Sequence, residues 1–64
     1  MFEIDIPEWV AWLAQDKDGC WWGYSVEPHQ HSTGWYENEV GDYIRLGPGE
    51  PSPDWQNSLR RNPD

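Results

Sequence analysis

Two groups of residues could bind a metal ion. The first is the turn segment Asp16-Lys17-Asp18-Gly19, and the second consists of Cys20, His29 and His31. The turn segment resembles the start of a calcium loop, but such a loop needs a further oxygen ligand after the glycine and a later bidentate glutamate. The cysteine and histidines supply three zinc ligands, whereas a structural zinc site needs four. We therefore predict no metal and no cofactor, with a hairpin turn at 16–19 and exposed loop histidines.

Covalent or acid–base catalysis has little support in this sequence. A nucleophilic Cys20 would need a neighbouring base and an electropositive setting, and the surrounding chain is acidic. No glycine-rich phosphate loop occurs. A chain of 64 residues leaves little volume for a pocket that excludes water. We predict that the protein has no catalytic residues and is not an enzyme.

The charge of the chain favours one class of partner. Twelve Asp and Glu residues against four Lys and Arg give a formal net charge of −8. Such a surface repels nucleic-acid phosphates and anionic lipid headgroups and attracts basic surfaces. We therefore predict a protein partner with a basic surface and no direct nucleic-acid or membrane binding. The simpler alternative is that the acidity only keeps a tryptophan-rich protein soluble.

Aromatic side chains are the expected source of the hydrophobic core. The chain contains six Trp, three Tyr and one Phe but a single cysteine, so an internal disulfide cannot form. We expect a single domain over residues 1–64, which is marginally stable without large core side chains or a partner subunit. The sequence leaves the oligomeric state undecided between a monomer and a homodimer. No apolar run approaches the length of about 20 residues that spans a bilayer. Without an export signal at the start, the cytoplasm of a bacterial host is the expected compartment.

The elements that position these residues are mainly strands. Turn residues 16–19 separate two stretches rich in Trp, Val and Tyr, which predicts a hairpin of residues 9–15 with 20–26. In the second strand Cys20, Trp22, Tyr24 and Val26 share one face, which we expect to be the core face. A helix from Pro7 to Gln15 is the competing interpretation, because Pro7 suits a first helical turn.

The remaining elements follow from turn residues and periodicity. We predict a mainly β fold, a three- to four-stranded antiparallel meander sheet with a short C-terminal helix packed on one face. Its Tyr43–Leu46 strand directs Ile44 and Leu46 to one face. The predicted segments begin with an N-terminal arm or edge strand at 1–8, followed by the sheet at 9–46. Within the sheet region lie a polar loop at 27–34 and an extended stretch from 35. A Pro/Gly connector at 47–53, the helix at 54–61 and a frayed tail at 62–64 complete the chain.

A single short helix can cover only one face of such a sheet. Aromatic rings are then left on the open face, ringed by acidic groups, as in many protein-binding hot spots. The residues predicted to bind a partner are Trp12, Trp21, Tyr43, Asp16, Asp18, Glu37 and Glu39.

The run from Trp12 to Tyr24 resembles a pattern in small uncharacterised proteins of phages and prophages. The pattern is W-x-A-x-D-x-D-G-x-x-W-x-Y, with Gln15 in place of its first acidic residue. Pro28, Trp35, the Tyr43-Ile44 strand and the closing segment 54–59 add to the resemblance. It implies an accessory protein in an infected or lysogenic bacterium and carries over no catalytic residue.

These observations together predict a noncatalytic interaction protein that binds a host protein through an acidic, aromatic surface. Its specific form would be mimicry of nucleic-acid charge against a DNA-binding or defence protein. The alternatives are a small-ligand or carbohydrate binder that uses exposed Trp rings, a metal-dependent protein that uses Cys20, His29 and His31, and a protein with a structural role.

Overall fold

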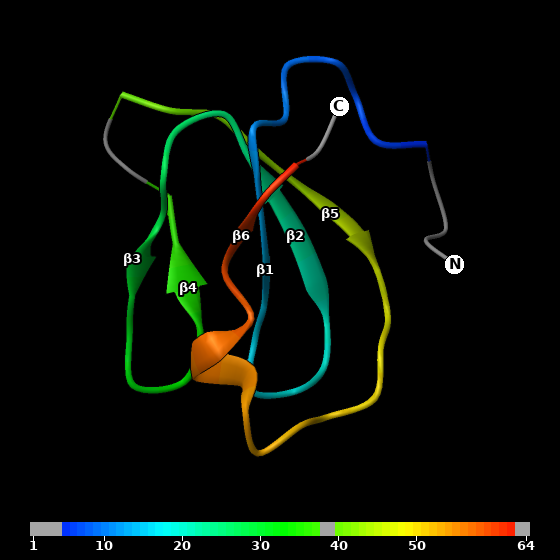
Figure 1. Cartoon of the computed structure of the whole chain (residues 1–64), viewed down its shortest axis with the longest axis vertical. Coiled ribbons are helices and arrows are strands. Elements are labelled where there is room, and N and C mark those ends of the chain that lie inside the picture. Colours follow the sequence, from blue (N-terminus) through cyan, green and yellow to red (C-terminus); the bar gives the residue numbers. More distant parts are fainter. Residues whose placement is uncertain (1–4, 38–39, 63–64) are drawn as a thin grey trace.

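The structure is a computed structural model that describes residues 5–37 and 40–62. It is mainly β, as predicted, and its strands form one four-stranded sheet and one two-stranded sheet (Figure 1). In chain order they are β1 (Trp12–Gln15), β2 (Trp21–Tyr24), β3 (His29–Gln30), β4 (Trp35–Tyr36), β5 (Tyr43–Gly47), the 3-10 turn η1 (Trp55–Asn57) and β6 (Arg60–Arg61).

The predicted hairpin is present as β1 and β2, joined by the turn at 16–19. The Gly19 N–H donates to the Asp16 carbonyl at 2.9 Å, and the Asp18 carboxylate accepts the Cys20 N–H at 2.9 Å. Gly19 takes φ 96°, a left-handed conformation that favours glycine. A side chain there would also collide with the Gly49 carbonyl. The turn chemistry read from the sequence therefore fixes this part of the fold.

The four-stranded sheet has the order β5-β2-β1-β6, with antiparallel pairs throughout. The Tyr43–Leu46 strand is confirmed as β5, and Ile44 and Leu46 both join the core as expected. The order is not that of a simple meander. The chain leaves β2 for a separate hairpin before it returns as β5, and its last strand comes back beside β1 (Figure 1).

The prediction of a polar loop at 27–34 was correct only in part. His29–Gln30 form β3, which pairs antiparallel with β4 in a second sheet. The His31 N–H donates to the Gly34 carbonyl at 2.7 Å and closes the connecting turn. Two residues per strand give almost no periodic signal, so this hairpin depends on what it packs against rather than on its own pattern.

The helix predicted over 54–61 is present only as a single 3-10 turn. Helical structure is limited to the single turn η1, and β6 follows it. The Ser58 hydroxyl accepts the Gln15 N–H at 2.8 Å and donates to the Trp55 carbonyl at 2.6 Å, which ties this turn to β1. A segment this short cannot sustain a helix by itself, and the open edge of β1 offers strand hydrogen bonds instead.

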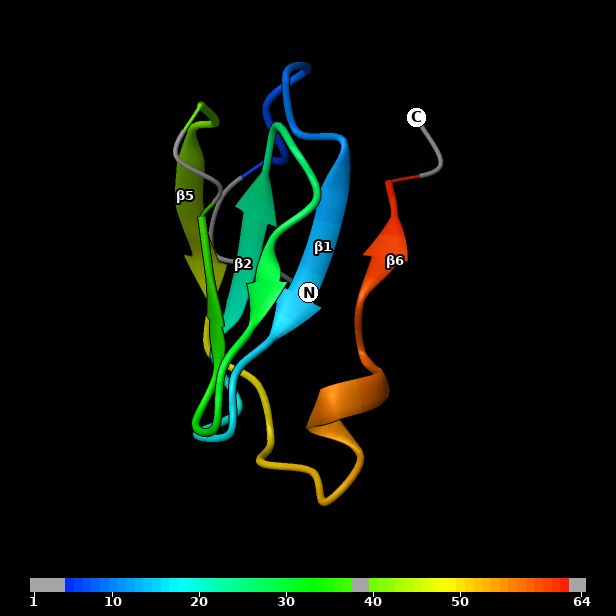
Figure 2. The same ribbon diagram turned by 90° about the vertical axis from the view of Figure 1, so that its left-hand side faces the viewer.

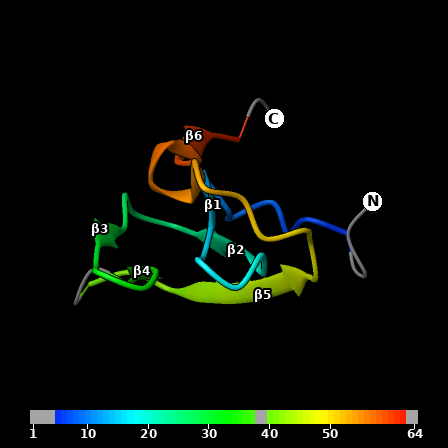
Figure 3. The same ribbon diagram turned by 90° about the horizontal axis from the view of Figure 1, so that it is seen from below.

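Both faces of the four-stranded sheet are covered in part. Figures 2 and 3 show the β3–β4 hairpin over one face of β1 and β2, and η1 with β6 beyond the edge of β1. The opposite face carries the core of Val10, Leu13 and Leu46, against which Ile6, Trp21 and Ile44 pack. The expectation that the Trp22–Tyr24 face holds the main core was therefore wrong. Gly23, on the Trp21 face, leaves the space that Val10 fills.

The tryptophans are buried to different extents. Trp55 is buried at 6% exposure, whereas Trp9 is 43% exposed, and the other four indoles are intermediate. Two of these four are covered by arginines of β6. The Arg60 guanidinium lies 5.1 Å from the Trp21 ring centre, and that of Arg61 lies 4.9 Å from Trp12. These stacked pairs attach the C-terminal strand to both sides of the sheet.

The start of the chain has irregular structure in its described part. Residues 5–7 have no regular structure, Glu8 and Trp9 form a turn, and residues 12–15 form β1, so the helix at 7–15 is absent. Residues 1–4 of the predicted arm and the end of the tail at 63–64 lie outside the described residues. Across residues 5–37 and 40–62, no helix has the length and apolar character needed to cross a bilayer.

Candidate functional site

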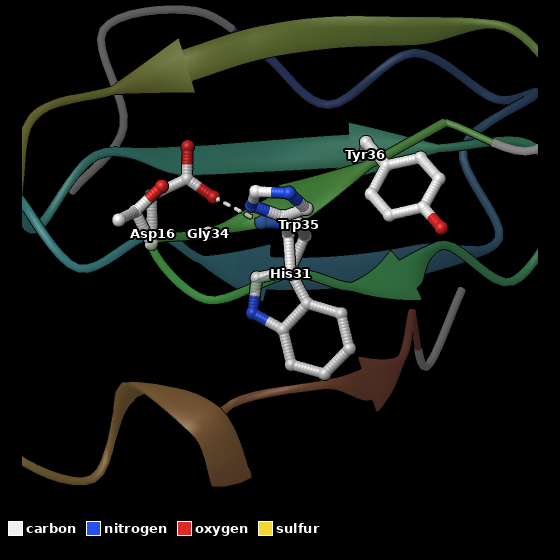
Figure 4. Close-up of a pocket in the computed structure, with 6 residues that line it drawn as sticks. Asp16, His31, Gly34, Trp35 and Tyr36 are labelled. Atoms are coloured by element: carbon white, nitrogen blue, oxygen red, sulfur yellow. Dashed lines mark hydrogen bonds between the residues drawn. The ribbon is translucent and has the colours of Figure 1, made fainter.

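Asp16 occupies the junction between the sheet and the β3–β4 hairpin. It follows the last residue of β1, and its Oδ1 accepts the Trp35 N–H at 2.9 Å (Figure 4). The Trp35 indole N–H donates to the Gln15 carbonyl at 3.0 Å. A side chain on Gly34 would approach the Asp16 carboxylate to 2.8 Å, so glycine lets the hairpin come this close. These contacts fix the carboxylate in a half-buried position.

A shallow hollow of about 440 Å³ opens on the outer side of this junction. Figure 4 shows the lining residues Asp16 and Trp35 joined by their hydrogen bond, with His31 next to it and Tyr36 farther along the hairpin. The Tyr36 ring centre lies 5.3 Å from that of His29 and 6.0 Å from that of His31. The histidines therefore pack around a tyrosine.

A second, smaller cleft of about 190 Å³ lies between the hairpin and the β2–β5 face of the sheet. Its aromatic lining comes from Trp22 and Tyr24 of β2, Trp35 of β4 and Tyr43 of β5, and its acidic lining from Asp16 and Glu37. We name these six residues the acidic aromatic cleft.

The rings of the acidic aromatic cleft differ in burial. The Trp22 and Tyr43 ring centres are 5.9 Å apart, with planes tilted by 46°. Tyr43 is 52% exposed, whereas Tyr24 at the base is 3% exposed. The cleft thus combines a buried floor with an accessible aromatic rim.

Two carboxylates act on the groups that line the cleft. Burial raises the pKa of Asp16, the Trp35 N–H opposes this rise, the charge of Asp18 adds to it, and the Trp22 indole opposes it. Burial also raises the pKa of Tyr24, and the nearby charges of Asp16 and Glu37 raise it further. Both carboxylates therefore act on the floor of the same cleft, where a cation would be stabilised.

Two polar side chains of the cleft are the Trp22 indole and the Asp16 carboxylate. The Trp22 indole nitrogen is buried and makes no hydrogen bond of standard geometry to a described residue, although it lies near enough to Asp16 to lower the pKa of that carboxyl. The Asp16 carboxylate accepts the Trp35 N–H through Oδ1. An ionised carboxylate has acceptor sites for more than one hydrogen bond, so Asp16 can also accept from a bound group.

The structure brings together three of the residues that the sequence predicted to bind a partner, namely Asp16, Glu37 and Tyr43. Trp12 shares their face of the sheet but lies at the β1–β6 edge beneath Arg61. Trp21 lies on the opposite face beneath Arg60, so the two indoles form no common stacking platform.

The other two predicted residues are placed differently. The Asp18 carboxylate is in the turn, where it accepts the Cys20 N–H. Glu39 lies outside the described residues.

The sequence interpretation missed Trp22, Tyr24 and Trp35 as site residues. The first two were assigned to the core, and Tyr24 is indeed buried. The available signal was the density of aromatic residues on one face of β2. That signal does not reveal a cleft, because the cleft exists only where the separate β3–β4 hairpin stops covering this face.

Metal ligation has no geometric counterpart in the parts of the chain that the structure describes. No group of three His, Cys, Asp or Glu side chains gathers there in a position to hold an ion.

Comparison with protein-family models, with curated proteins and with solved structures found no match to this chain.

Proposed function

We propose that this protein is a noncatalytic interaction module that binds a basic protein surface through its acidic, aromatic face. The observation that carries the proposal is the acidic aromatic cleft, in which an exposed ring, Tyr43, lies beside the carboxylates of Glu37 and Asp16. Aromatic rings that keep an exposed face next to charged groups are typical of interface hot spots. The role needs no reactive group.

The distribution of charge supports the same role. Of the nine Asp and Glu residues within the described part of the chain, eight are exposed and Asp16 is half-buried. An acidic surface of this kind steers a basic partner toward encounter, and the attraction falls as salt screens it. Mimicry of nucleic-acid charge against a DNA-binding or defence protein is the specific form of this proposal.

The biological setting is part of the proposal. A phage or prophage accessory protein that acts in the bacterial cytoplasm fits the sequence resemblance of residues 12–24, and it remains a prediction.

Affinity purification from a bacterial lysate, followed by binding assays with each purified candidate partner, tests this function. We expect a basic protein that is retained at low salt and released at high salt. Charge-neutral variants at exposed carboxylates should weaken its binding. Retention of no basic protein at low salt, or binding that salt does not affect, would contradict the proposal.

A further inference from the structure

We propose that the acidic aromatic cleft receives an arginine side chain of the protein partner, with the guanidinium over the Trp22 and Tyr43 rings and its N–H groups directed to Asp16 and Glu37. This inference rests on the proposed function and names the chemical group that the site recognises. The six lining residues give two kinds of contact that a guanidinium uses together, aromatic faces and carboxylate oxygens.

The fold itself shows that its indoles accept guanidinium groups. Arg60 lies over Trp21 and Arg61 over Trp12, with carbon-to-ring-centre distances of 5.1 Å and 4.9 Å. Trp22 is a third indole on the same hairpin, and Tyr43 extends its aromatic surface toward solvent. An arginine from a partner would repeat at the cleft a contact that the protein already makes twice internally.

The charges of the cleft select a cation over a neutral group of the same shape. The half-buried Asp16 carboxylate and the exposed Glu37 carboxylate both line the cleft. Both charges act on the Tyr24 hydroxyl at the floor. Arg45 pairs with Trp22 in the strand register but makes its own contacts and does not line the cleft.

A planar guanidinium suits this site better than an ammonium group. It stacks on a ring with its face while its edge keeps several N–H donors for carboxylates in the same plane. An ammonium is a compact, strongly hydrated charge that must lose water to reach the rings. Lysine should therefore bind more weakly than arginine.

The test is an NMR titration of the isotope-labelled protein at low salt with N-acetyl-arginine methylamide, its citrulline counterpart and the lysine counterpart. Citrulline keeps the shape of arginine and lacks the charge. The readout is the indole N–H resonance of Trp22, assigned with Trp22→Phe, with the exposed indole of Trp9 as the internal reference. We expect the Trp22 resonance to move with the arginine probe, less with lysine and not with citrulline.

Paired variants separate the cleft from general surface charge. Glu37→Gln and Glu8→Gln remove one exposed negative charge each, and only the first lies in the cleft. Tyr43→Ala and Tyr36→Ala each remove an exposed ring, and only Tyr43 lines the cleft. We expect the cleft variants to weaken arginine binding by roughly two- to fivefold each. The control variants Glu8→Gln and Tyr36→Ala should change the affinity for the arginine probe by less than about 1.5-fold. The small change expected for Glu8→Gln comes from the long-range loss of one negative charge.

Equal movement of Trp22 with citrulline, no movement with arginine, or equal effects of the cleft and control variants would overturn this inference. Failure of the inference and failure of the proposed function give different results. A basic partner that binds both sets of variants equally would leave the function standing and remove the arginine site. A cleft that binds the arginine probe in a protein that retains no basic partner would remove the function instead.

Discussion

Replacement of Gly23 by alanine tests how the sheet packs on the N-terminal segment. A Cβ atom at this position would lie 2.8 Å and 3.0 Å from the two methyl carbons of Val10, which is itself buried at 3% exposure. A β-branched valine has one preferred rotamer and cannot easily swing away. The added methyl group should therefore push the 5–11 segment off the sheet.

The size of the effect follows from two opposing contributions. Overpacking of a filled core costs about 1–3 kcal/mol, whereas Gly to Ala in a strand recovers about 0.5–1 kcal/mol. Gly23→Ala should then lower the free energy of unfolding by about 1–2 kcal/mol. In a domain of this size that corresponds to a fall in melting temperature of about 4–16 °C.

A double-mutant cycle with Val10→Ala gives the decisive comparison. The truncation alone should cost about 2 kcal/mol, because it removes buried methyl groups and leaves a cavity. In that background the Gly23→Ala methyl group has space, so the second change should be neutral or stabilising. Urea denaturation followed by tryptophan fluorescence measures all four proteins. If Gly23→Ala costs the same with valine or alanine at position 10, the packing argument is refuted.

Three further predictions concern polar side chains at the end of β1 and in the β3–β4 hairpin. Trp35→Phe removes the indole donor to the Gln15 carbonyl and should lower stability by about 1 kcal/mol, with faster amide exchange in the β3–β4 hairpin; unchanged exchange would contradict the anchoring role. Gln15→Leu leaves the Gly19 and Glu50 carbonyls without their side-chain donor and should cost about 2–4 kcal/mol in urea denaturation, whereas a neutral result would show that water replaces it. Because burial raises the pKa of Asp16 above 3.8, its folded-state proton is held more tightly, and Asp16→Asn should raise stability at neutral pH. That gain should vanish as the pH falls through the Asp16 pKa, so a gain that persists in acid would contradict the assignment.

Local chemistry made part of the fold predictable. The turn at 16–19 carries its own hydrogen bonds and a glycine in the left-handed conformation, so the β1–β2 hairpin follows from adjacent residues. The Tyr43–Leu46 strand has a clear period of two, and Ile44 and Leu46 reach the core as that period requires. These elements depend on contacts close in the sequence or on a strong alternation.

The elements that escaped prediction depend on distant contacts. β6 forms because β1 has an open edge for it to pair with, and because Arg60 and Arg61 of β6 stack on Trp21 of β2 and Trp12 of β1. The β3–β4 hairpin has two residues per strand and is held by Trp35 and Asp16. The prediction of the core face was wrong because a glycine contributes no side chain to a sheet face. Gly23 instead leaves space on that face for the Val10 side chain, which comes from another segment.

The candidate site was half predictable for the same reason. Tyr43, Glu37 and Asp16 were singled out as aromatic and acidic groups of a partly open sheet, and the structure places them around one cleft. The assignment of Trp12 and Trp21 to the same surface assumed that nothing stacks on them. Two arginines of the C-terminal strand stack on those indoles, and the residues next to positions 12 and 21 in the sequence do not predict this stacking.

The most direct test of the account is a set of intermolecular nuclear Overhauser effects between the protein and the arginine probe. The account predicts contacts from the probe's δ-methylene protons to the ring protons of Trp22 and Tyr43. Contacts to other rings alone, or contacts that persist when citrulline replaces arginine, would contradict it.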